Sequence, residues 1–253
     1  MKILKLSGTY LKRKDNQNLI LSVLCVFVFV VIFLTTAPTL PLYIDLGRYN
    51  PTRALVMIIP LIGALFFYRL RRAYQRGSEG ENRVTKVLSS ALSDDYLLIN
   101  DVQLAAGRRS NIDHIVLGPT GIFVLETKNH RGRIVCYVDS WTGIGQNPFT
   151  QARVNASSVH RVIKASGISI SKPLWINAVV VFADKKVELD RRKAPSNPEV
   201  LKIDELTNYI TQETRCEHLS TQEIELMSKE ILNVHKCGGA EIHFNQPHLK
   251  PDA

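Results

Sequence analysis

The sequence predicts an α/β domain with a mixed sheet flanked by helices, preceded by two transmembrane helices. Two observations lead to this fold class. The first 75 residues contain two dense apolar runs, whereas the remainder has the composition of an ordinary soluble domain. In that remainder, helical and strand patterns follow in the order helix, strands, helix, strand, which is typical of an α/β sandwich. The 253 residues allow one or two domains of ordinary size.

The two apolar runs predict a membrane hairpin. Residues 18–37 carry no charged side chain, and a helix of that length spans ~30 Å, the thickness of a bilayer core. Residues 54–68 form a shorter run that can span if flanking residues extend it. A signal peptide is the competing interpretation of the first run. A buried core helix is the competing interpretation of the second, in which case the first helix alone would place the soluble domain outside.

Basic residues predict the orientation of the hairpin. They lie before the first run and after the second, whereas the connection over residues 38–53 holds few charges. The positive-inside rule therefore places both termini and the soluble domain in the cytoplasm, at the plasma (inner) membrane, with a basic N-terminus over 1–17 and a basic linker over 69–76. Four scattered cysteines suggest no disulfide framework. The basic residues are Lys2, Lys5, Lys12, Arg13 and Lys14, then Arg69, Arg71, Arg72 and Arg76.

Periodicity and turn signals divide the soluble part into a domain over 77–183 and a helical extension over 184–253. Apolar residues at helical spacing predict the first helix, and Gly and Pro separate four strands from one another. A second helix and a fully buried strand follow, and two further helices end the chain. The expected ranges are helix 79–92, strands 96–104, 111–117, 121–128 and 133–138, helix 148–164, strand 174–182, and helices 204–211 and 221–234.

The strand over residues 121–128 carries the main chemical signal. Because side chains alternate faces along a strand, Glu126 and Lys128 share the face of Val124. A carboxylate among apolar neighbours is costly unless it is paired or binds a metal. The preceding strand brings Asp113 beside Glu126 through a short turn. Two adjacent carboxylates repel each other, and a divalent cation would relieve that repulsion.

Two helices add further polar groups to this face. Glu81 begins the apolar stripe of the first helix and is expected to point toward the sheet. Gln151 and Asn155 are spaced i, i+4 on the later helix and share one face. Hard oxygen ligands, a nearby lysine and neutral amides suit metal-assisted phosphodiester hydrolysis. The plainer interpretation is that a lone D…ExK pattern lies on a solvated strand face.

Four segments together resemble the nuclease-related domain (NERD) family of the PD-(D/E)XK endonuclease-like superfamily. They are GSEGE at 77–81, NIDHIV at 111–116, GIFVLETKN at 121–129 and NPFTQ at 147–151. The resemblance implies a restriction-endonuclease-like fold and cleavage of nucleic acid that depends on Mg²⁺ (or Mn²⁺). It also implies that Asp113, Glu126 and the backbone carbonyl of Thr127 bind the metal, and that Lys128 orients or activates water. By the same resemblance, Glu81 binds the metal or its water, and Gln151 is the amide that follows the core motif.

Several other residues carry weaker signals. Arg108, Arg109, Arg131 and Arg133 flank the strands with the acids and are candidates to bind phosphates, although solvated loop charges are equally compatible with them. Trp141 and Phe149 could stack on bases, but packing in the core is the simpler interpretation. The Cys216-x-His218 and His235-x-Cys237 pairs lack the usual spacing of zinc ligands, so no zinc is expected.

These observations favour a membrane-anchored, Mg²⁺-dependent endonuclease that acts on nucleic acid, with DNA as the preferred substrate. The net charge of +9 suits a polyanionic partner, although it also suits topology signalling. One alternative is a catalytically silent module of the same fold that binds nucleic acid or a protein at the membrane. Another is a structural membrane protein. The sequence is also compatible with a homodimer.

Overall fold

The computed structural model describes residues 1–5, 9–36, 51–104, 111–137, 140–145, 147–168, 174–194, 197–213 and 218–236. The chain forms two compact units. One is Thr9–Ser78, and the other combines Met1–Gly8 with Glu79–Ala253. The chain therefore starts in the second unit, leaves it to build the first, and returns.

The first unit is a pair of helices, α1 (Thr9–Thr36) and the first part of α2 (Pro51–Ala91). Ser22 Oγ donates to the carbonyl of Ala64 at 3.3 Å, and Arg71 Nε donates to Asp15 Oδ1 at 3.0 Å. Contacts that move forward along α1 move backward along α2, so the two helices pack as an antiparallel hairpin.

One helix in the described part of the chain is long and apolar enough to cross a membrane. It covers Leu11–Leu34 in α1, with a mean hydropathy of 2.7. No second helix in the described part of the chain meets that criterion, so the second predicted span, 54–68, lacks the same support. Residues 69–76, predicted as a linker, are helical and belong to α2. The predicted hairpin of two spans is therefore supported only for its first helix.

The second unit is built on a six-stranded sheet with the order β1-β2-β3-β4-β7-β9. Strands β2, β3 and β4 are antiparallel, whereas the pairs β1–β2, β4–β7 and β7–β9 are parallel, so the sheet is mixed as predicted. A smaller sheet has the order β6-β5-β8. The main strands are β1 (Lys2–Lys5), β2 (Leu97–Val102), β3 (Ile112–Gly118), β4 (Gly121–Lys128), β7 (Ile176–Phe182) and β9 (Glu199–Lys202), and the smaller sheet contains β5 (Gly132–Tyr137), β6 (Trp141–Thr142) and β8 (Val187–Lys193).

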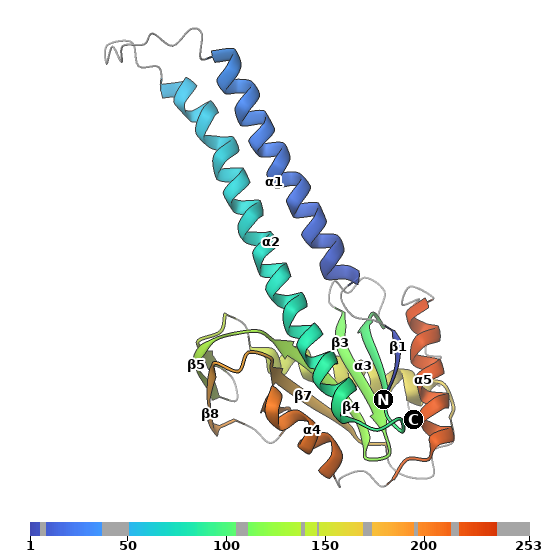
Figure 1. Cartoon of the computed structure of the whole chain (residues 1–253). Helices are drawn as coiled ribbons and strands as arrows, with labels where there is room; N and C mark the ends of the chain where they lie inside the picture. Colours follow the sequence, from blue (N-terminus) through green and yellow to red (C-terminus); the bar gives the residue numbers. More distant parts are fainter. Residues whose placement is uncertain are drawn as a thin grey trace, which may run out of the picture. The chain divides into compact units, whose positions relative to one another are not determined.

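Helices cover both faces of the main sheet (Figure 1). Helices α3 (Pro148–Ala165) and α5 (Thr221–Lys236) pack on the face that contains Ile122 and Val124. The end of α2 and α4 (Ile203–Gln212) pack on the face that contains Phe123 and Leu125. The alternation predicted for β4 is therefore confirmed, and each face has its own apolar core.

The sequence did not predict four of the strands. Strands β1 and β8 pair with strands far away in the sequence, β6 has only two residues, and β9 pairs with β7 across the charged β8, so no local pattern signals them. Residues 184–253, expected to be a helical extension, contain β8 and β9 as well as α4 and α5. Because β9 pairs with β7, the main sheet extends beyond the predicted boundary at residue 183.

The turn between β3 and β4 provides a test of this packing. A Cβ atom added at Gly118 would lie 2.1 Å from the ring of Tyr96, which is buried. We expect Gly118→Ala to lower the free energy of unfolding by about 1–3 kcal/mol, because the ring must move out of a packed core. Chemical denaturation checks this. Gly145→Ala is the matched control, since a Cβ there meets nothing within 4 Å. Equal stability of the two variants would contradict the prediction.

Candidate active site

The site begins at the end of β4, where apolar residues give way to polar ones. Glu126 is only 2% exposed, and its Oε1 accepts a hydrogen bond from Lys128 Nζ at 2.6 Å. Because residues two apart in a strand point to one face, the pair forms without any distortion of the backbone. A buried carboxylate therefore has a cation beside it, which reduces the cost of removing the charge from water.

Asp113 on β3 joins this pair through the backbone. The β3–β4 ladder ends at His114 and Leu125. Beyond that point the Thr127 N–H donates to Asp113 Oδ2 at 2.7 Å. The carboxylate thus takes the place that a main-chain carbonyl would otherwise fill, and this fixes its position beside the strand that carries Glu126.

Glu81 reaches the same region from α2. Its negative charge interacts with the charges of Asp113 and Glu126, so the structure brings the helix-borne acid to the strand acids. The close approach depends on Gly80, since a Cβ there would lie 2.9 Å from Asn129 Cβ, just beyond the end of β4. A larger residue at this position would push the helix away from the strand.

A fourth acid, Asp101, was not identified from the sequence. It lies on β2, where Asn100 pairs with His114 and Val102 with Ile112, so Asp101 lies opposite Asp113. Its φ is +55°, uncommon for a residue other than glycine. Asn111 Nδ2 donates to Asp101 Oδ1 at 2.5 Å. The only signal in the sequence is an acid that ends an apolar strand.

Helix α3 supplies amides to the site. The Asn147 side chain accepts from the Phe149 N–H at 2.9 Å and caps the helix, which begins with Pro148. In the first turns, Gln151 Oε1 lies 3.4 Å from Lys128 Nζ, and Asn155 Nδ2 lies 3.4 Å from Glu126 Oε2. The i, i+4 spacing of the two amides therefore directs both to the Glu126–Lys128 pair.

Burial and neighbouring negative charges raise the pKa values of the grouped carboxyl groups. Burial is the largest cause that raises the pKa of Glu81 to about 9, and neighbouring negative charges add to it. Burial and the charge of Asp113 likewise raise the pKa of Glu126 to about 8, against the opposing effect of Lys128. Burial also raises the pKa of Asp113 to about 6, although the Thr127 N–H acts against it. The arrangement thus keeps acids partly protonated near neutral pH.

Residues 76–183 match the nuclease-related domain (NERD) family. An uncharacterized protein of Bacillus anthracis is 34% identical over 100 residues, which cover 35% of this chain and 47% of that protein. The chain therefore spans about half the length of this curated relative. The structure of Pyrococcus furiosus SfsA in complex with Ca²⁺ aligns with a TM-score of 0.25 and 12% identity over 64% of this chain and 54% of that chain, which does not establish a shared fold.

The match encloses the acids on α2, β2, β3 and β4 and the amides of α3. The matched segment and the mixed sheet flanked by helices are consistent with a nuclease-like fold. Among the residues that the structure describes, no three His, Cys, Asp or Glu side chains form a group that could hold a metal ion by themselves. Any metal at this site would therefore need backbone or water oxygens in addition to the carboxylates.

The two predicted phosphate-binding arginines that the structure describes form ion pairs with acids outside the candidate site. Arg131 Nε donates to Asp184 Oδ2 at 2.5 Å, and an Arg133 Nη2 lies 3.9 Å from Asp190 Oδ2. Both arginine side chains are exposed, and exposed ion pairs contribute little to stability, so they can exchange partners. Arg108 and Arg109 lie outside the described residues.

The aromatic residues near the candidate site belong to the hydrophobic core. The rings of Trp141 and Phe149 pack edge to face at 4.9 Å, and both residues are buried, so packing replaces the base-stacking alternative. His114 is fully buried, with Nδ1 2.6 Å from Asn100 Oδ1, and burial lowers its pKa to about 3. Cys216 and Cys237 of the two weak zinc patterns lie outside the described residues.

The raised pKa of Glu126 predicts how stability depends on pH without metal. A carboxyl that binds its proton more tightly in the folded state stabilises the protein most below its unfolded pKa, near 4.5, and this contribution is lost as the pH rises toward about 8. We expect the thermal unfolding midpoint of the protein in detergent and EDTA to fall across that range. Glu126→Gln should flatten the fall, because an amide does not titrate.

The matched control for this measurement is Glu225→Gln, which alters an exposed acid on α5. It should leave the pH profile unchanged. Identical slopes for wild type and Glu126→Gln would contradict the assignment of the proton to the buried carboxyl.

Proposed function

We propose that this chain is a divalent-metal-dependent endonuclease that hydrolyses phosphodiester bonds of nucleic acid at a membrane. The observation that carries the proposal is the buried Glu126–Lys128 pair beside Asp113, inside the segment that matches the NERD family. An ordinary protein core has little reason to gather so many acids, because each raises the cost of ionising the others. A bound cation would offset the repulsion between the acids, and it would in turn attract an anionic substrate.

The donors available suit a hard cation such as Mg²⁺ or Mn²⁺. Mg²⁺ is commonly bound through one or two carboxylates and keeps several waters. We assign the ligands to Asp113, Glu126 and the carbonyl of Thr127, with Glu81 binding the metal or one of its waters. When bound, the metal would polarise a phosphoryl oxygen and lower the pKa of a water ligand.

The fold places a lysine and two amides beside the proposed metal ligands. Lys128 presents its ammonium group beside the carboxylates, where it would orient water and stabilise developing negative charge. Gln151 lies within hydrogen-bond distance of that ammonium group and limits its direction, and Asn155 does the same for Glu126. We expect Arg108, Arg109, Arg131 and Arg133 to contribute phosphate contacts that set affinity more than chemistry.

The substrate that we favour is DNA near the cytoplasmic face of the plasma membrane. The net charge of +9 favours nucleic acid, and the NERD segment follows a helical hairpin whose first helix can span a bilayer. The alternative is a silent module that binds nucleic acid or a protein partner there. Binding that survives the loss of Glu126, without cleavage by the wild type, would favour the alternative.

The topology that we propose has two spans, and strand pairing supports it. Strand β1 pairs with β2 in the sheet, so the residues before α1 lie on the same side of any membrane as the domain that follows α2. If Leu11–Leu34 crosses the bilayer, the chain must cross back before Glu79. Apolar residues exposed on α2, such as Ile59, Ile62 and Phe66, support the return through 54–68. The positive-inside rule then favours cytoplasmic termini.

Cleavage assays test the proposed activity. The full chain in detergent, with Mg²⁺ or Mn²⁺, should cut one or more of supercoiled plasmid, linear duplex, single-stranded DNA and RNA. Lys128→Ala and Asp113→Asn should each lower the rate roughly 10²-fold or more, because each removes transition-state stabilisation in a site shielded from water. EDTA should abolish cleavage.

Lys86→Ala is the control for these variants, since it removes an exposed lysine on α2 in the same unit. It should cut as the wild type does. Cleavage that persists in Lys128→Ala at the wild-type rate would contradict the proposal, as would a folded wild type that cuts none of the four substrates with either metal.

Labelling of single cysteines tests the topology. In a cysteine-free background, Tyr43→Cys in the predicted external loop should react with a membrane-impermeant maleimide on intact cells. Ser90→Cys in the NERD segment should react only after the cells are opened. Labelling of both from outside, or of Ser90→Cys alone, would contradict the proposed hairpin.

A further inference from the structure

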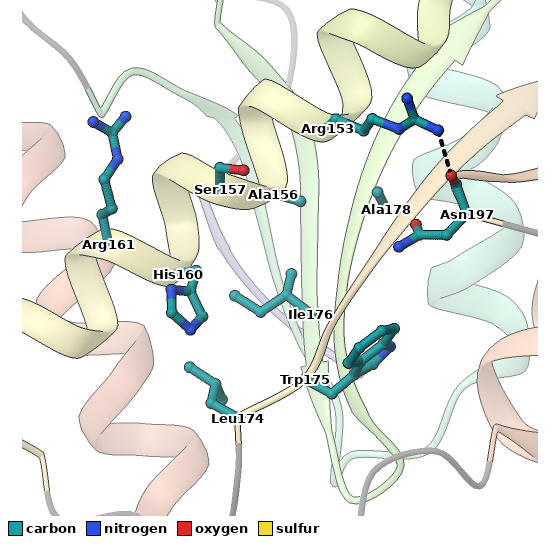
Figure 2. A pocket seen from close by; sticks show the side chains of 10 residues that line it. All are labelled: Arg153, Ala156, Ser157, His160, Arg161, Leu174, Trp175, Ile176, Ala178 and Asn197. Atoms are coloured by element: carbon teal, nitrogen blue, oxygen red, sulfur yellow. Dashed lines mark hydrogen bonds between the residues drawn. The ribbon is translucent and has the colours of Figure 1, made fainter. Parts of the chain in front are cut away.

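A pocket lies on the flank of α3 opposite the candidate active site. Figure 2 shows it between α3 and the start of β7, and its volume is about 550 Å³, within the range of small-molecule sites. At 100° per residue, Arg153 and His160 lie on the opposite side of the helix from Gln151 and Asn155. The pocket is therefore separate from the carboxylate cluster.

The charge of the lining favours an anion. Its ten residues include two arginines and a histidine and no acid. Arg153 is held in place, since one Nη2 donates to the carbonyl of Asn197 at 2.8 Å and the guanidinium lies 5.9 Å from the ring centre of Phe149 (Figure 2). A guanidinium has five N–H donors, so this bond leaves others for a phosphate. Arg161 points away from the pocket and lies at its edge.

The aromatic residue of the lining favours a flat ligand. Trp175 is 42% exposed, although a large apolar ring is usually buried. Its Nε1 donates to Asn177 Oδ1 at 2.9 Å, which fixes the orientation of the indole. Ala156, Ile176 and Ala178 supply an apolar floor beside it. A fixed, exposed indole beside an apolar floor can stack on a planar ring.

We propose that this pocket binds one nucleotide unit, with the base stacked on Trp175 and the phosphate paired with Arg153. Base stacking on aromatic rings and arginine–phosphate pairs recur in proteins that bind single strands. The Asn197 side chain, which Figure 2 shows beside Trp175, can reach the edge of the base. This inference rests on the proposed function only in taking nucleic acid as a source of the unit, and a free nucleotide has the same chemistry.

The register of the sheet gives the separation of the two sites along the strands. Ile176 on the pocket pairs with Ile122, and Phe182 pairs with Lys128. Six residues along a β-strand span roughly 20 Å, which equals about six steps of a stacked single strand of nucleic acid. If the unit belongs to a strand that also reaches the active site, oligonucleotides longer than about six nucleotides should therefore bind more tightly than shorter ones.

Fluorescence of the full chain in detergent and EDTA tests the proposal without any cleavage. The protein has two tryptophans, and Trp141 is buried in the core. A 5′-phosphorylated single-stranded oligonucleotide should therefore quench Trp175. An abasic oligonucleotide of equal charge should not. Deoxythymidine 5′-monophosphate is the third probe, and it distinguishes a free nucleotide from a strand as the source of the ligand.

Variants test whether the fluorescence quench comes from binding in this pocket. Trp175→Ala should weaken binding of a labelled oligonucleotide, measured by anisotropy, about 5- to 100-fold, whereas Trp175→Phe should lose the quench but bind within about threefold of wild type. Arg153→Ala should weaken binding and reduce the salt slope by about one. Lys164→Ala is the matched control, since it removes an exposed cation of α3 that does not line the pocket.

The outcomes separate this proposal from the nuclease. If an oligonucleotide quenches the fluorescence and Trp175→Ala abolishes the quench, the pocket is supported even when no substrate is cut with Mg²⁺. Cleavage by the wild type, with no quench by any probe, overturns the pocket and leaves the nuclease standing. Equal quenching by the abasic and native oligonucleotides, or unchanged binding by Trp175→Ala, also overturns it.

Discussion

The arrangement of this site follows from one electrostatic constraint, the gathering of four carboxylates where strand and helix ends meet. Each acid raises the free energy of the others when ionised, and burial raises it further. Burial and mutual repulsion account for the pKa of about 8 for Glu126 and about 9 for Glu81. The cluster is stable only if neighbouring groups offset this repulsion, and the polar groups around it do so by donating hydrogen bonds to the carboxylates.

The compensation comes from three parts of the fold, which are β4, α3 and the start of β3. Lys128 on β4 pairs with Glu126, and the Thr127 N–H binds Asp113 in place of a ladder hydrogen bond. Asn155 on α3 reaches the second oxygen of Glu126, and Asn111 at the start of β3 binds Asp101. Both oxygens of Glu126, Oδ2 of Asp113 and Oδ1 of Asp101 therefore accept hydrogen bonds. These donors hold the carboxylates in place against their mutual repulsion.

The sequence was informative where the signal is local. The alternation of β4 predicted that Glu126 and Lys128 share a face, and the i, i+4 spacing predicted that Gln151 and Asn155 do too. The sequence was silent where pairing is distant. Asp101 reaches the cluster only because its strand pairs with β3 and its φ is positive, and neither property has a signature in one short segment.

Strand β1 and helix α5 meet beside that same acid, which explains why residues outside the NERD match belong to the fold. Lys5 on β1 donates to the carbonyl of Asp101, and its Nζ lies 2.9 Å from His235 Nε2 on α5. The Gln103 N–H donates to Nδ1 of that ring at 3.1 Å. Burial lowers the pKa of Lys5, and the charge of Asp101 acts against that shift. Strand β1 and helix α5 therefore both hold the end of β2 that carries Asp101, through the Asp101 carbonyl and the Gln103 N–H.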